Sequence, residues 1–292
     1  MCAVMTSAYP SAPLRALDTL WLQVSGTLCN LACTHCFIAC SPSNHTHEMM
    51  PLESVTRYLA EADALGVKEC YVTGGEPFMH PRILDILEAA LAIGPVSILT
   101  NGILIRPETA ARLRRMSDAS GHRLELRVSI DGYDDAANDA IRGEGTFRKI
   151  LKGIRHLVEA GLPAVITVTG ACEAAGTPEG EHRFAEFLAE NGLPRLRLKV
   201  LPLLRLGAEP QRSRPYLRCE TLAGRELSAA QTAALQCTSC RMATARGVWV
   251  CPILLDDPEA RMGETLAETM RPFDLKYPAC HTCHATGLTC RT

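Results

Sequence analysis

Six short runs of apolar and β-branched residues, each ending beside glycine or proline, constrain the fold of this chain more than any other feature. An amphipathic stretch usually follows each run, and strands that alternate with helices predict an α/β fold with a parallel sheet and right-handed crossovers. Parallel barrels of this kind place their active sites at the carboxyl ends of the strands. The expected strands are Leu20–Ser25, Glu69–Thr73, Val96–Thr100, Leu124–Ile130, Ala164–Thr169 and Leu196–Leu201.

Three cysteines, Cys29, Cys33 and Cys36, follow the first expected strand with the spacing CxxxCxxC. Three thiolates from one loop can hold three irons of a four-iron cubane cluster, and the fourth iron stays open to a small molecule. The same spacing also fits one face of a buried helix, but the polar residues within the segment and the further Cys40 argue against that reading. A zinc site is the other alternative. Because the strand exits are rich in glycine and lie at the same end of the expected sheet, we expect them to converge with the triad.

Composition and charge exclude several classes of protein. The formal net charge of −2 over 292 residues gives no general attraction to nucleic acid or to an anionic membrane. The chain has no apolar run of about eighteen residues and no N-terminal signal segment, so we expect a cytoplasmic protein with no membrane partner. For the 14 cysteines of such a protein, metal ligation is a stronger explanation than disulfides.

A second group of cysteines lies near the C-terminus and contains two CxxC pairs, which is a strong metal signal. Two such pairs suit either an iron–sulfur cluster or a closed tetrahedral zinc site, and the tail alone does not separate these. Because the tail shows little apolar periodicity, we expect a small domain that folds around metal rather than around a hydrophobic core. Its cysteines are Cys237, Cys240, Cys251, Cys280, Cys283 and Cys290.

Together, these motifs resemble the radical S-adenosylmethionine (SAM) superfamily over roughly residues 18–203. Each motif is weak by itself, but their shared order and spacing make the resemblance strong. The matching segments are the cysteine triad, Gly74-Gly75-Glu76-Pro77, Thr100-Asn101-Gly102, Ser129-Ile130-Asp131-Gly132, and residues 140–147, which look like a phrase common in members with an extra C-terminal cluster.

The resemblance implies a partial (β/α)6 TIM-like barrel that holds a [4Fe-4S] cluster, with SAM chelating the open iron. The cluster would pass one electron to SAM and release a 5′-deoxyadenosyl radical, and an external donor such as flavodoxin or ferredoxin would supply the electron. The expected divisions of the chain are an N-terminal extension (1–17), the barrel core (18–203), an Arg-rich linker (204–235) and a cysteine-rich auxiliary-cluster domain (236–292).

The resemblance also assigns roles to single residues. Gly74 and Gly75 would expose backbone carbonyls to the methionine ammonium, and Glu76 would help to hold that site, although it also suits a helix cap. Ser129 and Asp131 would contact the ribose hydroxyls, or would simply cap a strand exit. The full set expected to contact SAM is His35, Gly74, Gly75, Glu76, Pro77, Asn101, Ser129, Asp131, Thr167 and Leu201, where His35 stands in place of the family's usual apolar residue.

The tail resembles the auxiliary-cluster extensions called SPASM and twitch. Its spacing departs from the fuller SPASM pattern, so we expect one auxiliary [4Fe-4S] cluster with ligands drawn from Cys237 or Cys240, Cys251, Cys280, Cys283 and Cys290. The expected function is hydrogen abstraction from a peptide or a small metabolite. The alternative is a non-catalytic iron–sulfur or zinc protein that acts as a scaffold or electron carrier. The arginines of the linker could grip an anionic substrate, or belong to a solvated loop.

Overall fold

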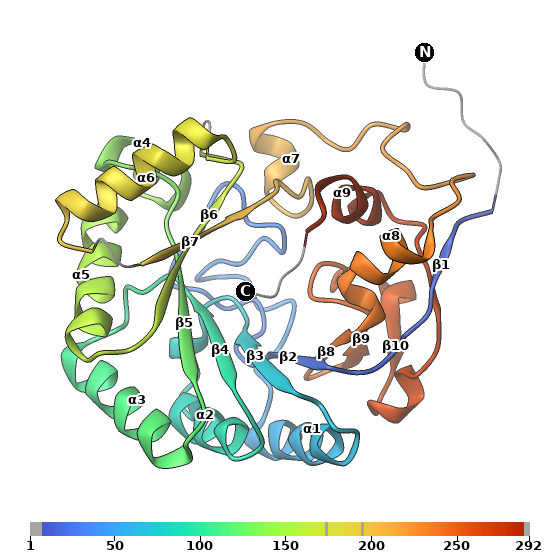
Figure 1. Cartoon of the computed structure of the whole chain (residues 1–292), viewed down its shortest axis with the longest axis horizontal. Helices are drawn as coiled ribbons and strands as arrows, with labels where there is room; N and C mark the ends of the chain where they lie inside the picture. Colours follow the sequence, from blue (N-terminus) through green and yellow to red (C-terminus); the bar gives the residue numbers. More distant parts are fainter. Residues whose placement is uncertain (1–7, 173–174, 194–195, 289–292) are drawn as a thin grey trace.

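In the computed structural model, one sheet of nine strands runs through the part of the chain that the structure describes, which is residues 8–172, 175–193 and 196–288. Its strand order is β10-β9-β8-β2-β3-β4-β5-β6-β7, and β2 to β7 are successive parallel neighbours that curve into an open barrel (Figure 1). The predicted α/β partial barrel is confirmed. Its strands are β2 (Thr19–Gln23), β3 (Glu69–Thr73), β4 (Val96–Thr100), β5 (Leu124–Ser129), β6 (Ala164–Thr169) and β7 (Arg197–Leu201).

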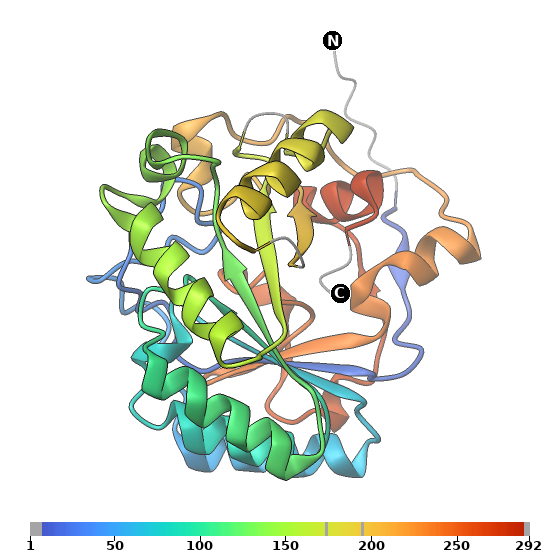
Figure 2. The same cartoon turned by 60° about the vertical axis from the view of Figure 1, so that its left-hand side comes forward.

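Helices cover the outer face of this barrel, as Figure 2 shows. Strand side chains alternate, so Leu20 and Leu22 of β2 join the core beneath the helices, whereas Trp21 and Gln23 face the barrel interior. A fully buried leucine contributes about 1.5–3 kcal/mol, so packing against the sheet fixes the helices more than their own propensity does. The helices are α1 (Leu52–Ala64), η1 (Pro77–Met79), α2 (Ile83–Leu91), α3 (Pro107–Ser120), α4 (Asp135–Arg142), α5 (Thr146–Glu159) and α6 (Pro178–Glu190).

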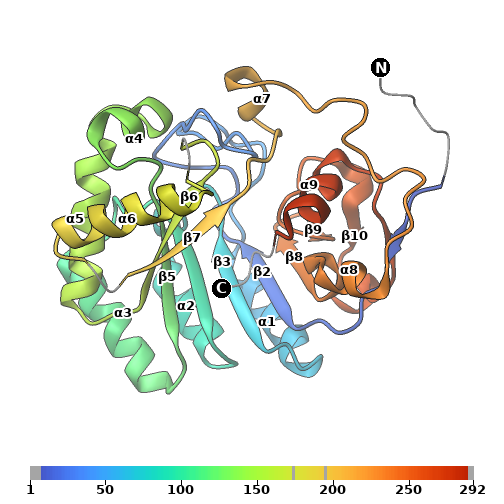
Figure 3. The same cartoon turned by 45° about the horizontal axis from the view of Figure 1, so that its top comes forward.

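The tail extends the same sheet instead of forming a separate unit. Strand β8 (Cys240–Thr244) pairs in parallel with β2, and β9 (Gly247–Trp249) and β10 (Arg261–Gly263) continue the sheet as antiparallel strands (Figure 3). A second hydrophobic core packs there, with Trp249, Leu255 and Phe273 among its buried members. The expectation of a tail without a hydrophobic core is therefore wrong. The physical reason is the edge of β2, whose backbone groups pair with β8 and so bring the tail onto the barrel.

The N-terminal extension and the linker also pack against the tail. Strand β1 (Ser11–Ala12) pairs with β11 (Phe273–Asp274), so the extension lies beside the last part of the described chain. None of the described helices is both long and apolar enough to cross a lipid bilayer. The remaining elements are α7 (Glu209–Arg212), α8 (Ala229–Ala234), η2 (Gln236–Thr238), η3 (Pro258–Ala260), η4 (Ala267–Thr269) and α9 (Pro278–Thr286).

The linker arginines are engaged in ion pairs. Arg214 contacts Glu220 at 2.8 Å, Arg205 approaches the same carboxylate at 3.6 Å, and Arg212 contacts the buried Glu209 at 2.8 Å. Each of these three arginines therefore has a carboxylate partner within the linker, which favours a structural role over the grip on an anionic substrate.

Candidate functional site

The three triad cysteines line one cavity of about 230 Å³ at the carboxyl ends of the barrel strands. The structure thus brings the cysteine loop and the glycine-rich strand exits together, as the sequence predicted. Seven of the ten residues expected to contact SAM line the same cavity, namely His35, Gly74, Gly75, Asn101, Ser129, Thr167 and Leu201. Glu76, Pro77 and Asp131 do not line it.

Two glycines at the exit of β3 allow the cysteine loop to approach. A Cβ atom on Gly75 would lie 2.1 Å from the carbonyl oxygen of Leu28, and one on Gly74 would lie 2.1 Å from the Oγ of Ser25. The Glu76 amide donates to the same Leu28 carbonyl at 3.0 Å. Only glycine permits this contact, so the Gly-Gly pair sets the position of the loop that begins the triad.

Glu76 is buried and acts below the cavity, not in it. Its carboxylate accepts from the Thr100 hydroxyl at 2.8 Å, the Asn101 amide at 2.8 Å and the Phe78 amide at 3.0 Å. Burial raises its pKa to about 7, although these hydrogen bonds act in the opposite direction. Glu76 does not line the cavity, and its contact with SAM stays a prediction. The carboxylate caps η1 and joins the exits of β3 and β4, and Pro77 only begins that short helix.

Asp131 is also fully buried, and four donors occupy its two oxygens. Oδ2 pairs with His35 Nε2 and with Arg142, each at 2.6 Å, while Oδ1 accepts from the Thr169 amide at 2.9 Å and hydroxyl at 2.8 Å. Burial opposes ionisation, but Arg142 and His35 outweigh it and hold the pKa of Asp131 well below its usual range. Protein donors already occupy the carboxylate of Asp131, and its contact with the ribose stays a prediction.

Arg142 is a residue that sequence reasoning left without a role. Its guanidinium is 6% exposed, pairs with Asp131, and approaches the Sγ of Cys33 at 3.9 Å. The only signal was its place in the segment 140–147 that resembled a family phrase. Through Asp131, Arg142 and His35, the exit of β5 and the end of α4 hold the middle of the cysteine loop.

The cavity suits an iron–sulfur cluster with a polar ligand. N–H groups point at each triad sulfur, with Leu31 on Cys29 at 3.4 Å, Cys40 on Cys36 at 3.3 Å, and Arg142 on Cys33. Such donors stabilise ligating thiolates. Hydrogen bonds from Cys40 lower the pKa of Cys36 to about 6, whereas burial raises that of Cys29 to about 12.

The cavity wall also holds buried polar atoms with no hydrogen-bond partner among the described residues. They include both amide atoms of Gln23 and the Oγ1 of Thr167. Buried polar groups are rarely left unmatched in native proteins, so a polar ligand is expected to meet them. SAM, with its charged methionine end and its ribose hydroxyls, has groups of the required kind.

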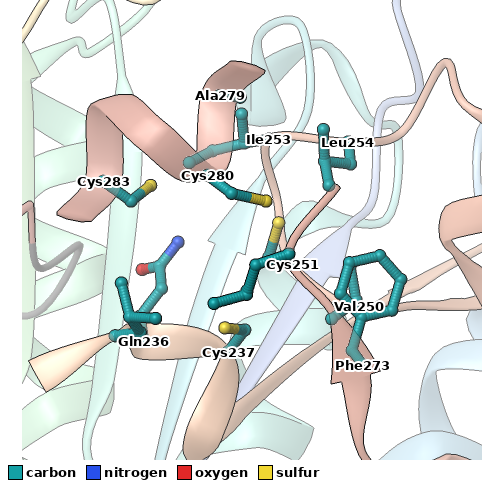
Figure 4. A pocket seen from close by; sticks show the side chains of 12 residues that line it. Gln236, Cys237, Val250, Cys251, Ile253, Leu254, Phe273, Ala279, Cys280 and Cys283 are labelled. Carbon is teal, nitrogen blue, oxygen red and sulfur yellow. The ribbon is translucent and has the colours of Figure 1, made fainter. Parts of the chain in front are cut away.

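In the tail, four cysteines surround a second, much smaller cavity of about 30 Å³ (Figure 4). Cys280 and Cys283 come from one face of α9, three residues apart, and Cys237 and Cys251 come from η2 and the loop after β9. Of the predicted ligands, Cys240 begins β8 and does not line this cavity, and Cys290 lies outside the described residues.

Burial keeps these tail thiols in the neutral, protonated form when no metal is bound. Burial raises the pKa of Cys237 to about 12 and raises the pKa values of Cys251 and Cys280 as well. The thiols therefore keep their protons until a metal displaces them. The fully buried Arg241 lies next to this group, and its guanidinium donates to the carbonyls of Cys237 at 2.7 Å and Thr269 at 2.9 Å.

The two cavities share a wall. Ile253 lines both of them, Cys251 lines only the small one and Pro252 only the large one. A three-residue segment thus connects a tail thiol directly to the cavity that contains the triad.

A family model described as the Radical SAM superfamily matches residues 24–173. The chain is 32% identical over 139 residues to the subtilosin biosynthesis protein AlbA of Bacillus subtilis. The aligned segment covers 46% of this chain and 29% of AlbA. It is 33% identical over 143 residues to the mycofactocin maturase MftC of Mycobacterium tuberculosis, covering 47% of this chain and 34% of MftC. The match therefore spans about a third of these relatives' own length.

Solved structures with a similar fold include SuiB of Streptococcus suis bound to SAM. Its TM-score is 0.62 at 19% identity, covering 87% of this chain and 63% of SuiB. The enzyme anSMEcpe with bound SAM and the Kp18Cys peptide also has a TM-score of 0.62, at 17% identity, covering 86% of this chain and 79% of that one. Together with the fold, the triad cavity and a family match over more than half of its length, these findings establish that the chain belongs to the radical SAM superfamily.

Proposed function

We propose that this chain is a peptide-modifying radical SAM enzyme that carries a second iron–sulfur centre in its tail. The observation that carries the proposal is the single cavity where three cysteine thiols meet unmatched polar atoms of the barrel wall. The superfamily's cofactors are a [4Fe-4S] cluster and SAM, and when bound they supply a 5′-deoxyadenosyl radical that abstracts hydrogen from a substrate.

Three groups of residues in the chain have separate roles in this function. Cys29, Cys33 and Cys36 would hold the [4Fe-4S] cluster through their thiolates. The barrel wall orients the polar ligand and keeps bulk water away, because most of the cavity lining is apolar. The buried pair of Asp131 and Arg142 fixes the loop between the first and last triad cysteines.

For the tail, we propose Cys237, Cys251, Cys280 and Cys283 as the ligands of one auxiliary [4Fe-4S] cluster. A single zinc ion needs its thiolates gathered about one point. Among the residues that the structure describes, no three His, Cys, Asp or Glu side chains are placed to hold a single metal ion. Four thiols spread around a cavity support a cluster instead.

A peptide substrate is supported by the relatives named above, of which one is named for bacteriocin biosynthesis and another as a maturase. We propose that a reduced flavodoxin or ferredoxin supplies the electron.

The central test is anaerobic reconstitution with iron and sulfide, followed by reaction with SAM and dithionite. We expect 5′-deoxyadenosine and methionine, and we expect none from the variant with Cys29, Cys33 and Cys36 all changed to Ala. A matched control changes the three cysteines Cys70, Cys172 and Cys219, which line neither cavity, to Ala. Equal SAM cleavage by the triad variant and the control would refute the assignment.

The peptide substrate needs its own test. The reconstituted enzyme is incubated with a short peptide encoded beside its gene, and the peptide mass is followed together with 5′-deoxyadenosine. A mass change that requires both SAM and the triad supports the proposal. An unchanged peptide, with turnover of a metabolite from the same gene neighbourhood, would move the assignment to small molecules.

A further inference from the structure

The main cavity has two chemically different walls. Its polar side chains, such as Gln23, Asn101 and Thr167, all belong to residues up to Thr169, which precede β7. Beyond Leu201, every described residue that lines the cavity is apolar. Six of these residues have long side chains and form what we call the apolar face: Leu203, Leu204, Met242, Ile253, Leu255 and Leu288.

The tail supplies most of the apolar face. Met242 of β8 pairs in register with Trp21 of β2, which lines the same cavity, so the face begins where the tail joins the barrel (Figure 3). Ile253 and Leu255 follow β9, and Leu288 follows α9. In the sheet, β2 and β3 separate β8 from β4, β5 and β6, whose ends carry the polar lining residues. The tail part of the apolar face and the polar wall therefore occupy different sides of the cavity.

Leu203 shows that the apolar face is more than an ordinary piece of core. It follows β7, is half-buried, lines the cavity, and belongs to neither hydrophobic core of the described chain. Leu206, on the same segment, is half-buried as well, but it packs against the second core and does not line the cavity. A single half-buried leucine is unremarkable by itself, but several apolar side chains that converge on one cavity indicate a ligand with an apolar group.

The apolar face suits a different chemical group from SAM. The ammonium, carboxylate and ribose hydroxyls of SAM need hydrogen-bond partners, which the polar wall offers. An aliphatic side chain on the apolar face would gain free energy in proportion to the apolar area that it buries. An amide or charged side chain would lose its water there without a side-chain partner to replace it. Met242 adds tolerance of shape, because an unbranched thioether adapts to different apolar neighbours.

We propose that the apolar face binds an aliphatic side chain of the peptide substrate, such as that of leucine, isoleucine or valine, and so places it beside the triad. This inference rests on the proposed function, because it assumes that the peptide enters the cavity that holds SAM. It makes Leu203 and Met242 specificity-determining residues. A peptide with an amide side chain at the same position should bind more weakly.

The test uses the reconstituted, SAM-bound protein and three N-acetylated tripeptide amides, in which leucine, asparagine or alanine lies between two alanines. Leucine and asparagine have nearly the same shape, so their comparison isolates polarity. Anaerobic thermal melting gives the half-saturating concentration of each peptide. We expect the leucine peptide to bind at least about tenfold more tightly than the asparagine peptide, and more tightly than the alanine peptide.

The decisive quantity is the asparagine-to-leucine ratio of half-saturating concentrations. It compares two peptides on one protein, so a general loss of stability does not change it. Leu203→Asn should lower this ratio at least about threefold. Leu206→Asn is the matched control on the same segment and should keep the ratio of the unchanged protein. Met242→Gln keeps the length of the side chain and adds a polar end; it should also lower the ratio, and it serves if Leu203→Asn fails to fold.

Several results would overturn the proposal. These are equal binding of the leucine and asparagine peptides, tighter binding of the asparagine peptide, and a ratio that changes no more in Leu203→Asn and Met242→Gln than in the control. SAM affinity is measured on the same samples. If Leu203→Asn lost SAM binding as strongly as leucine-peptide binding, the apolar face would serve the cofactor and the proposal would fall. Failure of the unchanged protein to cleave SAM would instead refute the proposed function, whatever the peptides do.

Discussion

Replacing only one member of the buried ion pair between Asp131 and Arg142 should destabilise the barrel far more than replacing both members at once. The two side chains are 0% and 6% exposed, and their charged atoms are 2.6 Å apart. Removing one partner leaves an uncompensated buried charge, which costs about 3–5 kcal/mol. Replacing both with uncharged groups is often nearly neutral. We therefore expect Asp131→Asn and Arg142→Leu each to lose about 3 kcal/mol or more, and the double variant to recover most of that loss.

The assay is urea unfolding followed by circular dichroism on cluster-free protein, with all four proteins of the double-mutant cycle. Loss of the Asp131 charge also frees His35 and the middle of the cysteine loop, so iron retained after reconstitution should fall in the same order as stability. The reasoning fails if the double variant is no more stable than the worse of the two single variants. It also fails if Asp131→Asn is as stable as the unchanged protein.

Three further predictions concern the cysteine loop, Glu76 and the tail. Gly75→Ala should lose most of its reconstituted iron, measured per chain, because its Cβ would lie 2.1 Å from the carbonyl oxygen of Leu28. Burial raises the pKa of Glu76 from 4.5 to about 7, so the folded protein holds its proton more tightly. The free energy of unfolding should therefore fall by about 3 kcal/mol as pH rises from 4.5 to 7, and denaturant titrations of Glu76→Gln should show a flatter profile over that interval. Cys280→Ala combined with Cys283→Ala should stop product formation while some uncoupled 5′-deoxyadenosine remains, and normal turnover by a folded double variant would exclude a catalytic role for the tail.

The sequence was a good guide to the barrel because the strands carry their own signals. Three predicted strands, Glu69–Thr73, Val96–Thr100 and Ala164–Thr169, agree with the structure at both ends. Each is a short apolar run bounded by turn-forming residues, so local chemistry sets its limits. Strand β8 is different. Its sequence Cys-Arg-Met-Ala-Thr has no strand pattern, and it is a strand because the edge of β2 offers it backbone partners.

The site shows the same division between local and long-range information. The spacing of Cys29, Cys33 and Cys36 is local, and the structure brings all three to one cavity. The role of Asp131 depends on Arg142, eleven residues further on, and on His35, almost a hundred residues earlier. From the sequence alone, a carboxylate at a strand exit is interpreted as a ligand contact, because the order of residues does not reveal which protein donors bind its oxygens.

In the tail, sequence spacing could not separate Cys237 from Cys240, because both belong to one CxxC pair. The structure separates them, since Cys240 already belongs to β8 and Cys237 faces the small cavity. The pairing of β8 with β2 places Cys240 in the sheet, and so it also places the tail cysteines relative to the triad that follows β2. Strand β8 pairs with β2, and the buried Ile253 lines both cavities. A metal centre held by the tail cysteines is therefore coupled to the position of the barrel wall. That rigid connection is what the proposed auxiliary cluster needs if it is to exchange an electron with a substrate bound beside the triad.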